Sequence, residues 1–297
     1  MSQSFDRIVE IMAALRAPGG CPWDRKQTHE SLKPYLLEET YEVLETIDQQ
    51  DKPKLREELG DVLLQVLFHS QIASETGTFT VTDVMDQLGD KLIRRHPHVF
   101  QKPPGDADAV SSEQVLHRWE EIKRAERKES GRTGSVLHDV PKTLPALLRA
   151  YQVQARAARV GFDWPDNAQG LEQVSAKLDE ELGELRQAIQ NASTGDTSSS
   201  SAERLVPDAY REAMEAEFGD VLFSMVNLAR HLKVNPEDAL RRATNRFAER
   251  FRFIEDQADK TGRTINELSL QEMDRYWEGA KAAERSATDR EPELPPA

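Results

Sequence analysis

Acidic residues at helical spacing form two blocks in the first half of the chain. Glu39 and Glu42 stand three residues apart, as do Glu58 and Asp61. Residues three or four apart share one face of a helix, so each block directs two carboxylates the same way. Two such helices packed antiparallel would bring four carboxylates together, and these repel one another more strongly on partial burial. A cation would relieve the repulsion, and oxygen-only ligands favour Mg²⁺ or Mn²⁺ over zinc.

The second half of the chain repeats both blocks in the same order. The pattern that both halves share is Glu-Glu-x-x-Glu, followed by Glu-x-x-Asp with a glycine inside. A solvated helix face would explain any single block, but it needs no particular carboxylate at a particular place twice. Gly60 and Gly219 each cost about 1 kcal/mol relative to alanine inside a helix, so we expect close helix approach there. The repeated blocks predict two metal sites.

Basic and aromatic residues are also duplicated. Lys91 and Arg95 match Arg246 and Arg250, and each half ends on a tryptophan followed four residues later by a lysine, Trp119 with Lys123 and Trp277 with Lys281. Basic groups cannot bind the metal, but they can bind phosphate oxygens that the metal also binds, as a di- or triphosphate requires. Surface charge or salt bridges to the acidic clusters, and core or interface anchoring by the tryptophans, remain alternatives.

These matched blocks predict a duplicated, all-α protein of two tandem helical-bundle domains. Apolar residues recur at three- and four-residue steps, as in the stripe from Phe5 to Leu15 and in Leu59, Val62, Leu63, Val66 and Leu67. Strand-like alternation is nearly absent. We expect a first repeat at 1–127, a linker at 128–135, a second repeat at 136–285 with a flexible serine-rich insertion at 193–201, and a disordered tail at 286–297.

Composition narrows the class of protein. The 297 residues carry 53 acidic and 39 basic side chains, a net charge of −14, which disfavours stable binding to nucleic acid or anionic membranes. Cys21 is the sole cysteine, which favours a reducing compartment, with a reactive thiol as the minor alternative. No apolar run approaches a membrane span, so we expect a cytoplasmic protein. Pro97 keeps His96 and His98 off a shared helix face, which disfavours a metal site there.

The ordered motifs resemble those of the MazG-type nucleoside triphosphate pyrophosphohydrolases, of the all-α NTP pyrophosphatase class. The resemblance rests on Gly20 to Asp24, Leu37 to Glu42, Glu58 to Leu63 and Lys91 to Phe100, and on their second-half counterparts, and it covers nearly the whole chain. The counterparts are Gly161 to Trp164, Glu180 to Glu184, Glu217 to Leu222 and Arg246 to Phe251.

The resemblance implies helical bundles that form a homodimer. It also implies Mg²⁺-dependent hydrolysis of nucleoside triphosphates to monophosphate and pyrophosphate, with broad specificity and a housecleaning role on the nucleotide pool. It implies that Glu38 and Glu180 orient or activate water. It places phosphate and base contacts on Arg246, Arg250, Trp277 and Lys281, with first-repeat counterparts Lys91, Arg95, Trp119 and Lys123. The implied metal ligands are Glu39, Glu42, Glu58, Asp61, Glu181, Glu184, Glu217 and Asp220.

Two points stay open on the sequence. The acidic blocks of the second repeat lie further apart than the family pattern, because of the serine-rich insertion, and either repeat could be the one that turns over. A narrower dUTP or phosphoribosyl-ATP pyrophosphohydrolase, or a non-catalytic acidic helical adaptor, is the alternative to the broad enzyme.

Overall fold

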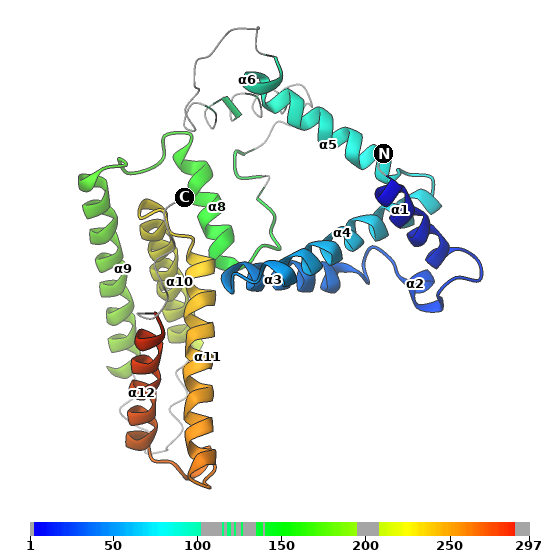
Figure 1. The fold of residues 1–297 in the computed structure, drawn as a ribbon. Helices are drawn as coiled ribbons and strands as arrows, with labels where there is room; N and C mark the ends of the chain where they lie inside the picture. Colours follow the sequence, from blue (N-terminus) through cyan, green and yellow to red (C-terminus); the bar gives the residue numbers. More distant parts are fainter. Residues whose placement is uncertain are drawn as a thin grey trace, which may run out of the picture. The chain divides into compact units, whose positions relative to one another are not determined.

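A computed structural model describes residues 3–101, 115, 118, 119, 122, 126, 135–138, 140–194 and 208–288. The chain divides into two compact units, Met1–Thr133 and Gly134–Ala297. Every regular element among the described residues is a helix, which confirms the all-α prediction (Figure 1). None of these helices is both long and apolar enough to cross a bilayer.

The first unit contains α1 (Gln3–Arg16), α2 (Pro22–Lys26), α3 (Lys33–Asp48), α4 (Lys52–Glu75), α5 (Val81–Arg95) and α6 (Pro97–Phe100). Helices α3 and α4 lie side by side, and α1 packs on α4. The turn between α3 and α4 ends where Asp51 accepts a hydrogen bond from the Lys54 amide, at 3.0 Å, and Pro53 occupies the first turn of α4. This short connection makes α3 and α4 an antiparallel pair.

The core of the first unit forms around Met12, Leu32, Leu67 and Phe68. The predicted apolar face of α1 is confirmed, because Phe5 and its neighbours in the stripe pack against this core. The predicted face of α4 is confirmed at Leu67, which is in the core, but it is wrong at Leu59 and Leu63, which are 51% and 42% exposed. The buried face of α4 is rotated toward Gln65 and Phe68, since Glu58 on that face points inward to the carboxylates of α3.

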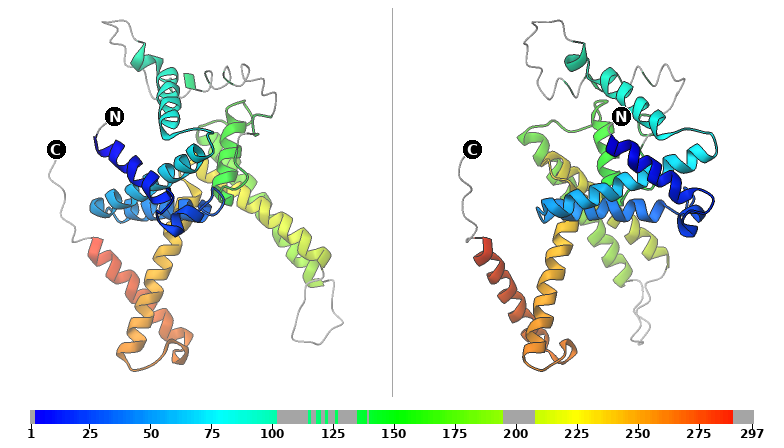
Figure 2. Two further views of the ribbon diagram at one scale, coloured as in Figure 1. Left: turned by 90° about the vertical axis from the view of Figure 1, so that its right-hand side faces the viewer. Right: turned by 45° about the vertical axis from the view of Figure 1, so that its right-hand side comes forward.

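The second unit contains α8 (Ala146–Ala158), α9 (Ala168–Thr194), α10 (Asp208–His231), α11 (Pro236–Lys260), the short 3₁₀ helix η1 (Ile265–Glu267) and α12 (Leu270–Thr288). Helices α9 and α10 form a long antiparallel pair, and α8 packs across α10 (Figure 2). Helices α11 and α12 form a second pair, which diverges from the first in Figure 2 and has its own core of Ile254, Ala258 and Leu268.

The serine-rich segment follows α9. That helix continues through Thr194, so the first two residues of the predicted insertion 193–201 are helical, and the others lie outside the described residues. The predicted tail 286–297 likewise begins inside α12, which ends at Thr288, with the remainder outside the described part of the chain. Most of the predicted linker 128–135 is also outside it.

Candidate functional site

A carboxylate cluster lies between α9 and α10 of the second unit. Glu181 on α9 and Glu217 and Asp220 on α10 each offer a carboxylate oxygen, and these oxygens lie within 4.8 Å of one another. Glu181 is the buried member, with only 6% of its surface exposed, and Asp220 is exposed. The antiparallel packing of α9 on α10 brings together acids that are far apart in the sequence.

An equivalent carboxylate cluster lies between α3 and α4 of the first unit. It consists of Glu39 on α3 and Glu58 and Asp61 on α4, with the same 4.8 Å limit between ligand oxygens. Glu58 is the buried member here, at 6% exposure. The structure therefore brings together three of the four acids expected in each repeat.

The fourth acid of each repeat borders its cluster. Burial raises the pKa of Glu58, and the neighbouring carboxyl group of Glu42 raises it further. Burial raises the pKa of Glu184, and the charges of Glu181 and Glu217 raise it further. Both acids therefore share the electrostatic environment of the cluster beside them.

Crowded carboxylates make each cluster suited to a cation. Burial raises the pKa of Glu39, and the nearby charges of Asp61 and Glu42 add to this effect. Mutual repulsion of this kind is removed by a hard divalent cation, which prefers carboxylate oxygens. The donor set and its spacing fit a metal ion of this class in both units.

Each buried acid also has a lysine one helical turn before it. Lys177 donates to Glu181 at 2.7 Å and to Glu180 at 2.9 Å, and these hydrogen bonds raise the pKa of Lys177. In the first unit, Lys54 lies 3.7 Å from Glu58. Neither lysine was predicted from the sequence, although each stands four residues before a candidate ligand, a spacing that places the two side chains on one helix face.

The duplicated basic residues of the second unit lie on the α11–α12 pair. Arg250 donates to Glu284 at 2.7 Å, and its guanidinium carbon lies 5.4 Å from the centre of the Trp277 ring. Lys281 pairs with Glu278 at 2.7 Å. Arg250 and Lys281 therefore form the salt bridges that the sequence left open, but with acids of α12 instead of those of the carboxylate cluster. Arg246 lies on α11, one turn before Arg250.

The first unit has the same arrangement in part. Arg95 donates to Glu126 at 2.7 Å, and this hydrogen bond is the main reason that the pKa of Glu126 falls to about 2. The ring of His96 meets that of Trp119 edge to face at 5.0 Å. Lys91 lies on α5, and Lys123 is outside the described residues.

A cavity of about 610 Å³ opens beside the carboxylate cluster of the second unit. Lys177, Glu181 and Asp220 line it at one side. The rest of the wall comes from the turn that holds Leu137, from α8 and α10, and from the loop that precedes α9. Besides Leu137, its main residues are Val153, Gln154, Ala157, Phe162, Trp164, Phe223, Ser224 and Asn227. Its volume is in the range of small-molecule sites.

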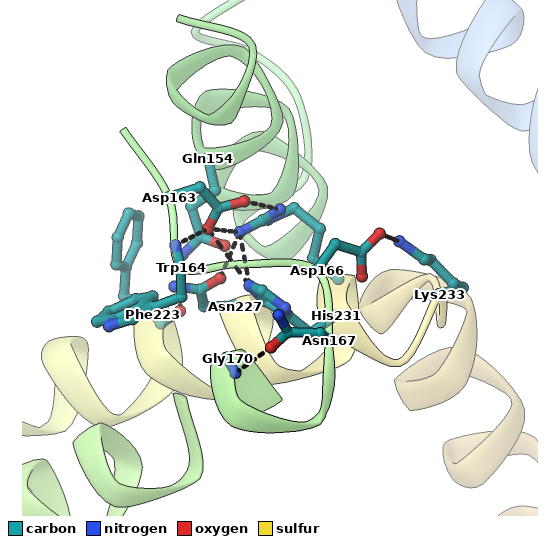
Figure 3. A network of polar contacts seen from close by, with 11 residues as sticks. Gln154, Asp163, Trp164, Asp166, Asn167, Gly170, Phe223, Asn227, His231 and Lys233 are labelled. Atoms are coloured by element: carbon teal, nitrogen blue, oxygen red, sulfur yellow. Dashed lines mark hydrogen bonds and ion pairs between the residues drawn. The ribbon is translucent and has the colours of Figure 1, made fainter. Parts of the chain in front are cut away.

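The loop over this cavity is fixed by Asp163 (Figure 3). Arg230 of α10 donates to both carboxylate oxygens of Asp163, at 2.7 and 2.5 Å, and His231 lies 3.3 Å from one of them. Burial opposes ionisation of Asp163, but the Arg230 and His231 contacts outweigh it and hold its pKa below the usual range. Gly161 turns the loop with a φ of +90°, a conformation that favours glycine.

The close approach expected at Gly60 and Gly219 is wrong for the described chain. A Cβ added at either glycine would have no heavy atom of the described residues within 4 Å, apart from its own helix and chain neighbours. The helix surface next to Asp61 and Asp220 is therefore open in both units.

Comparison with known proteins identifies the family. The model of the MazG nucleotide pyrophosphohydrolase domain matches residues 27–100 and 169–252, which hold the two carboxylate clusters. The chain belongs to the MazG family. Its two matches also confirm that the MazG-type domain occurs twice in tandem.

Relatives of this MazG-family chain match it along most of its length. It is 47% identical to the nucleoside triphosphate pyrophosphohydrolase/pyrophosphatase MazG of Thermotoga maritima, over 95% of this chain and 97% of that protein. It is 42% identical to the nucleoside triphosphate pyrophosphohydrolase of Escherichia coli K12, over 94% and 98%. The uncharacterized protein YabN of Bacillus subtilis is 43% identical over 95% of this chain and 52% of its own length.

We expect Mg²⁺ to stabilise the protein through both clusters. A ligand that binds only the folded state raises its stability, so the unfolding temperature should rise with Mg²⁺ concentration. Asp220→Asn should reduce this rise, and the double variant with Asp61→Asn and Asp220→Asn should abolish it. Neither variant should lose stability in metal-free buffer, because each substitution removes a repelling charge. Thermal unfolding with MgCl₂ or a chelator measures this, and Asp274→Asn on the exposed face of α12 is the control.

The stabilisation by Mg²⁺ and the contribution of these acids to metal-free stability should change with pH in opposite directions. Carboxyl groups with raised pKa values take up protons above the usual acid range, and protons compete with the metal, so the Mg²⁺ effect should shrink as pH falls. These groups bind protons more tightly in the folded protein than in the unfolded chain. Without metal, their contribution to the stability of the fold should therefore increase as pH falls. A Mg²⁺ effect that is independent of pH, or equal in the double variant, would exclude metal binding at these acids.

Proposed function

We propose that this protein hydrolyses nucleoside triphosphates to nucleoside monophosphate and pyrophosphate. The observation that carries the proposal is the pair of carboxylate clusters within the two regions that match the MazG domain. The names of the Thermotoga and Escherichia relatives support this reaction. Attack at the α-phosphorus separates the monophosphate from pyrophosphate and needs no covalent intermediate. The single cysteine and a nucleotide substrate support a cytoplasmic location.

Mg²⁺, with Mn²⁺ as a substitute, is the metal that these donors favour. In the second unit the ligands would be Glu181, Glu184, Glu217 and Asp220, and in the first unit Glu39, Glu42, Glu58 and Asp61. When bound, the metal would offset the charge that develops on the phosphate oxygens. All-oxygen ligands at this spacing support this assignment.

The protein side chains would position the ligands and the water. Lys177 holds Glu180 and Glu181 together, since its ammonium group contacts both. Glu181 would then be fixed toward the cluster, and Glu180, the more exposed of the two, would accept a proton from the attacking water. Glu38 would have this role in the first unit.

Phosphate contacts would come from the α11–α12 pair. Arg250 and Lys281 are held by acids of α12, so an incoming triphosphate would compete with Glu284 and Glu278 for them. Arg246, Arg250 and Lys281 would bind phosphate oxygens. Trp277 was expected near the base, but it lies against Arg250 and does not line the cavity beside the cluster, so it would support Arg250 instead. Lys91, Arg95, Trp119 and Lys123 are the first-repeat counterparts.

A homodimer is the assembly that the exposed surface supports. Phe218, Leu222 and Met225 follow one another at helical spacing on α10, and Phe218 and Met225 are more than half exposed. They flank Gly219, where the helix surface is open. Apolar faces of this kind mark protein contacts. Light scattering should give twice the 33.6 kDa of one chain, and Phe218→Glu should yield monomers, whereas a monomeric wild type would exclude this interface.

The reaction is tested with a nucleotide panel. We expect Mg²⁺-dependent release of pyrophosphate from several ribo- and deoxyribonucleoside triphosphates, because the aliphatic and aromatic walls of the cavity beside the cluster would pack against any common base. Product analysis by chromatography separates pyrophosphate from orthophosphate. Turnover of one nucleotide alone would favour a narrower pyrophosphohydrolase, and a diphosphate product would exclude the proposal.

Substitutions in the two clusters separate the repeats. We expect Glu181→Ala to lower turnover about 100-fold or more, by analogy with the loss of a supporting metal ligand or transition-state contact. Glu39→Ala should leave most turnover intact, because the large cavity lies beside the second cluster. Circular dichroism should show that both variants fold. The reverse pattern would place turnover in the first repeat, and equal partial losses would indicate two working sites.

A further inference from the structure

We propose that the cavity of the second unit is a nucleobase subsite in which Gln154 and Asn227 read the hydrogen-bonding edge of the base. This inference rests on the proposed function, because it assigns the base of that substrate to a place. The cavity shares Lys177, Glu181 and Asp220 with the catalytic side and extends from there toward α8. A triphosphate at the carboxylate cluster would therefore have space for its nucleoside on the α8 side.

Gln154 offers an acceptor that the described part of the chain leaves unpaired. This residue of α8 lines the cavity and is only 6% exposed. Its Nε2 donates to the main-chain carbonyl of Phe223 at 2.8 Å, and a carbonyl only accepts, so the orientation of the amide is fixed. Its Oε1 is buried and has no hydrogen-bond partner among the described residues. A buried acceptor of this kind is costly, and an N–H donor from a ligand would satisfy it.

Asn227 offers the complementary donor. Its Oδ1 accepts from Nη2 of Arg230 at 2.7 Å, and a guanidinium only donates, so this amide is also fixed. No hydrogen bond from its Nδ2 is made within the described part of the chain, and Asn227 lines the same cavity (Figure 3). One acceptor and one donor match the paired donor and acceptor found on the Watson–Crick edge of a base.

The remaining walls suit a flat aromatic ligand. Val153, Ala157 and Phe223 supply apolar surface, and Phe162 and Trp164 lie on the loop that Asp163 fixes to α10. Phe162 is 83% exposed, which leaves its ring available to a ligand. Stacking on aromatic side chains binds bases with little regard to sequence or identity. The walls would thus bind any base, while Gln154 would require an N–H group on it.

Matched substrate pairs test this requirement. ATP and purine riboside triphosphate differ by one exocyclic amino group, and CTP and pyrimidin-2-one riboside triphosphate differ in the same way. We expect wild type to prefer the amino-bearing member of each pair by about 5- to 50-fold in kcat/KM, the range for one buried hydrogen bond. In Gln154→Met, which keeps the length of the side chain, the preference should disappear, mainly through KM.

The controls are on the same helix. Gln152→Met does not alter a residue that lines the cavity and should keep the wild-type preference. Ala157→Leu reduces the cavity volume without removing the Gln154 hydrogen bond, so it should raise KM for every nucleotide even if Gln154→Met does not fold. Assays in a Glu39→Ala background remove any contribution of the first cluster.

Two different results would overturn two different claims. Wild-type protein that hydrolyses no triphosphate would refute the proposed function. Wild-type protein that is active but shows the same pair preference in a folded Gln154→Met variant, or unchanged KM values in Ala157→Leu, would refute the base subsite while leaving the reaction intact.

Discussion

Repulsion between carboxylates held on neighbouring helices is the constraint on which the structure of both units depends. Glu58 and Glu181 are each 6% exposed, yet both face other acids across a helix pair. Such a group is stable only when it is protonated, paired or bound to a cation. The helix pairs α3–α4 and α9–α10 must therefore be held by packing elsewhere, as they are by α1 and α8. One lysine offsets part of the charge in each cluster, and helix packing outside the clusters holds the acids together.

The two units manage this repulsion in different ways. In the first unit the buried acid and its lysine, Glu58 and Lys54, lie on the second acidic helix, with 3.7 Å between their charged groups. In the second unit they lie on the first acidic helix, where Lys177 contacts Glu181 at 2.7 Å. Tyr35 stands where Lys177 would be in the first repeat. Duplication has kept the acids while the neutralising side chain has changed position.

The fold places Arg250 and Lys281 on a different helix pair from the carboxylate cluster of the second unit. Arg250 lies against Trp277 and Glu284 on the α11–α12 pair, which has a separate core and diverges from α9–α10. This separation prevents the cations from neutralising the cluster directly. In the reaction proposed above, a polyphosphate with its metal would bridge these two oppositely charged surfaces.

The sequence alone determined the helices, the duplication and the acids of each cluster. Spacing of three residues on a helix is local geometry, so Glu217 and Asp220 share a face whatever surrounds them. Breakers such as Pro53 and Pro236 fix helix starts for the same local reason. Tertiary structure decided which faces are buried: Leu59 and Leu63 belong to an apolar stripe yet are exposed. It also decided that the side-chain N–H of Gln154 donates to the carbonyl of Phe223, 69 residues away, while its side-chain oxygen has no partner among the described residues. Contacts of that kind depend on how helices meet in space, and periodicity along one helix carries no information about them.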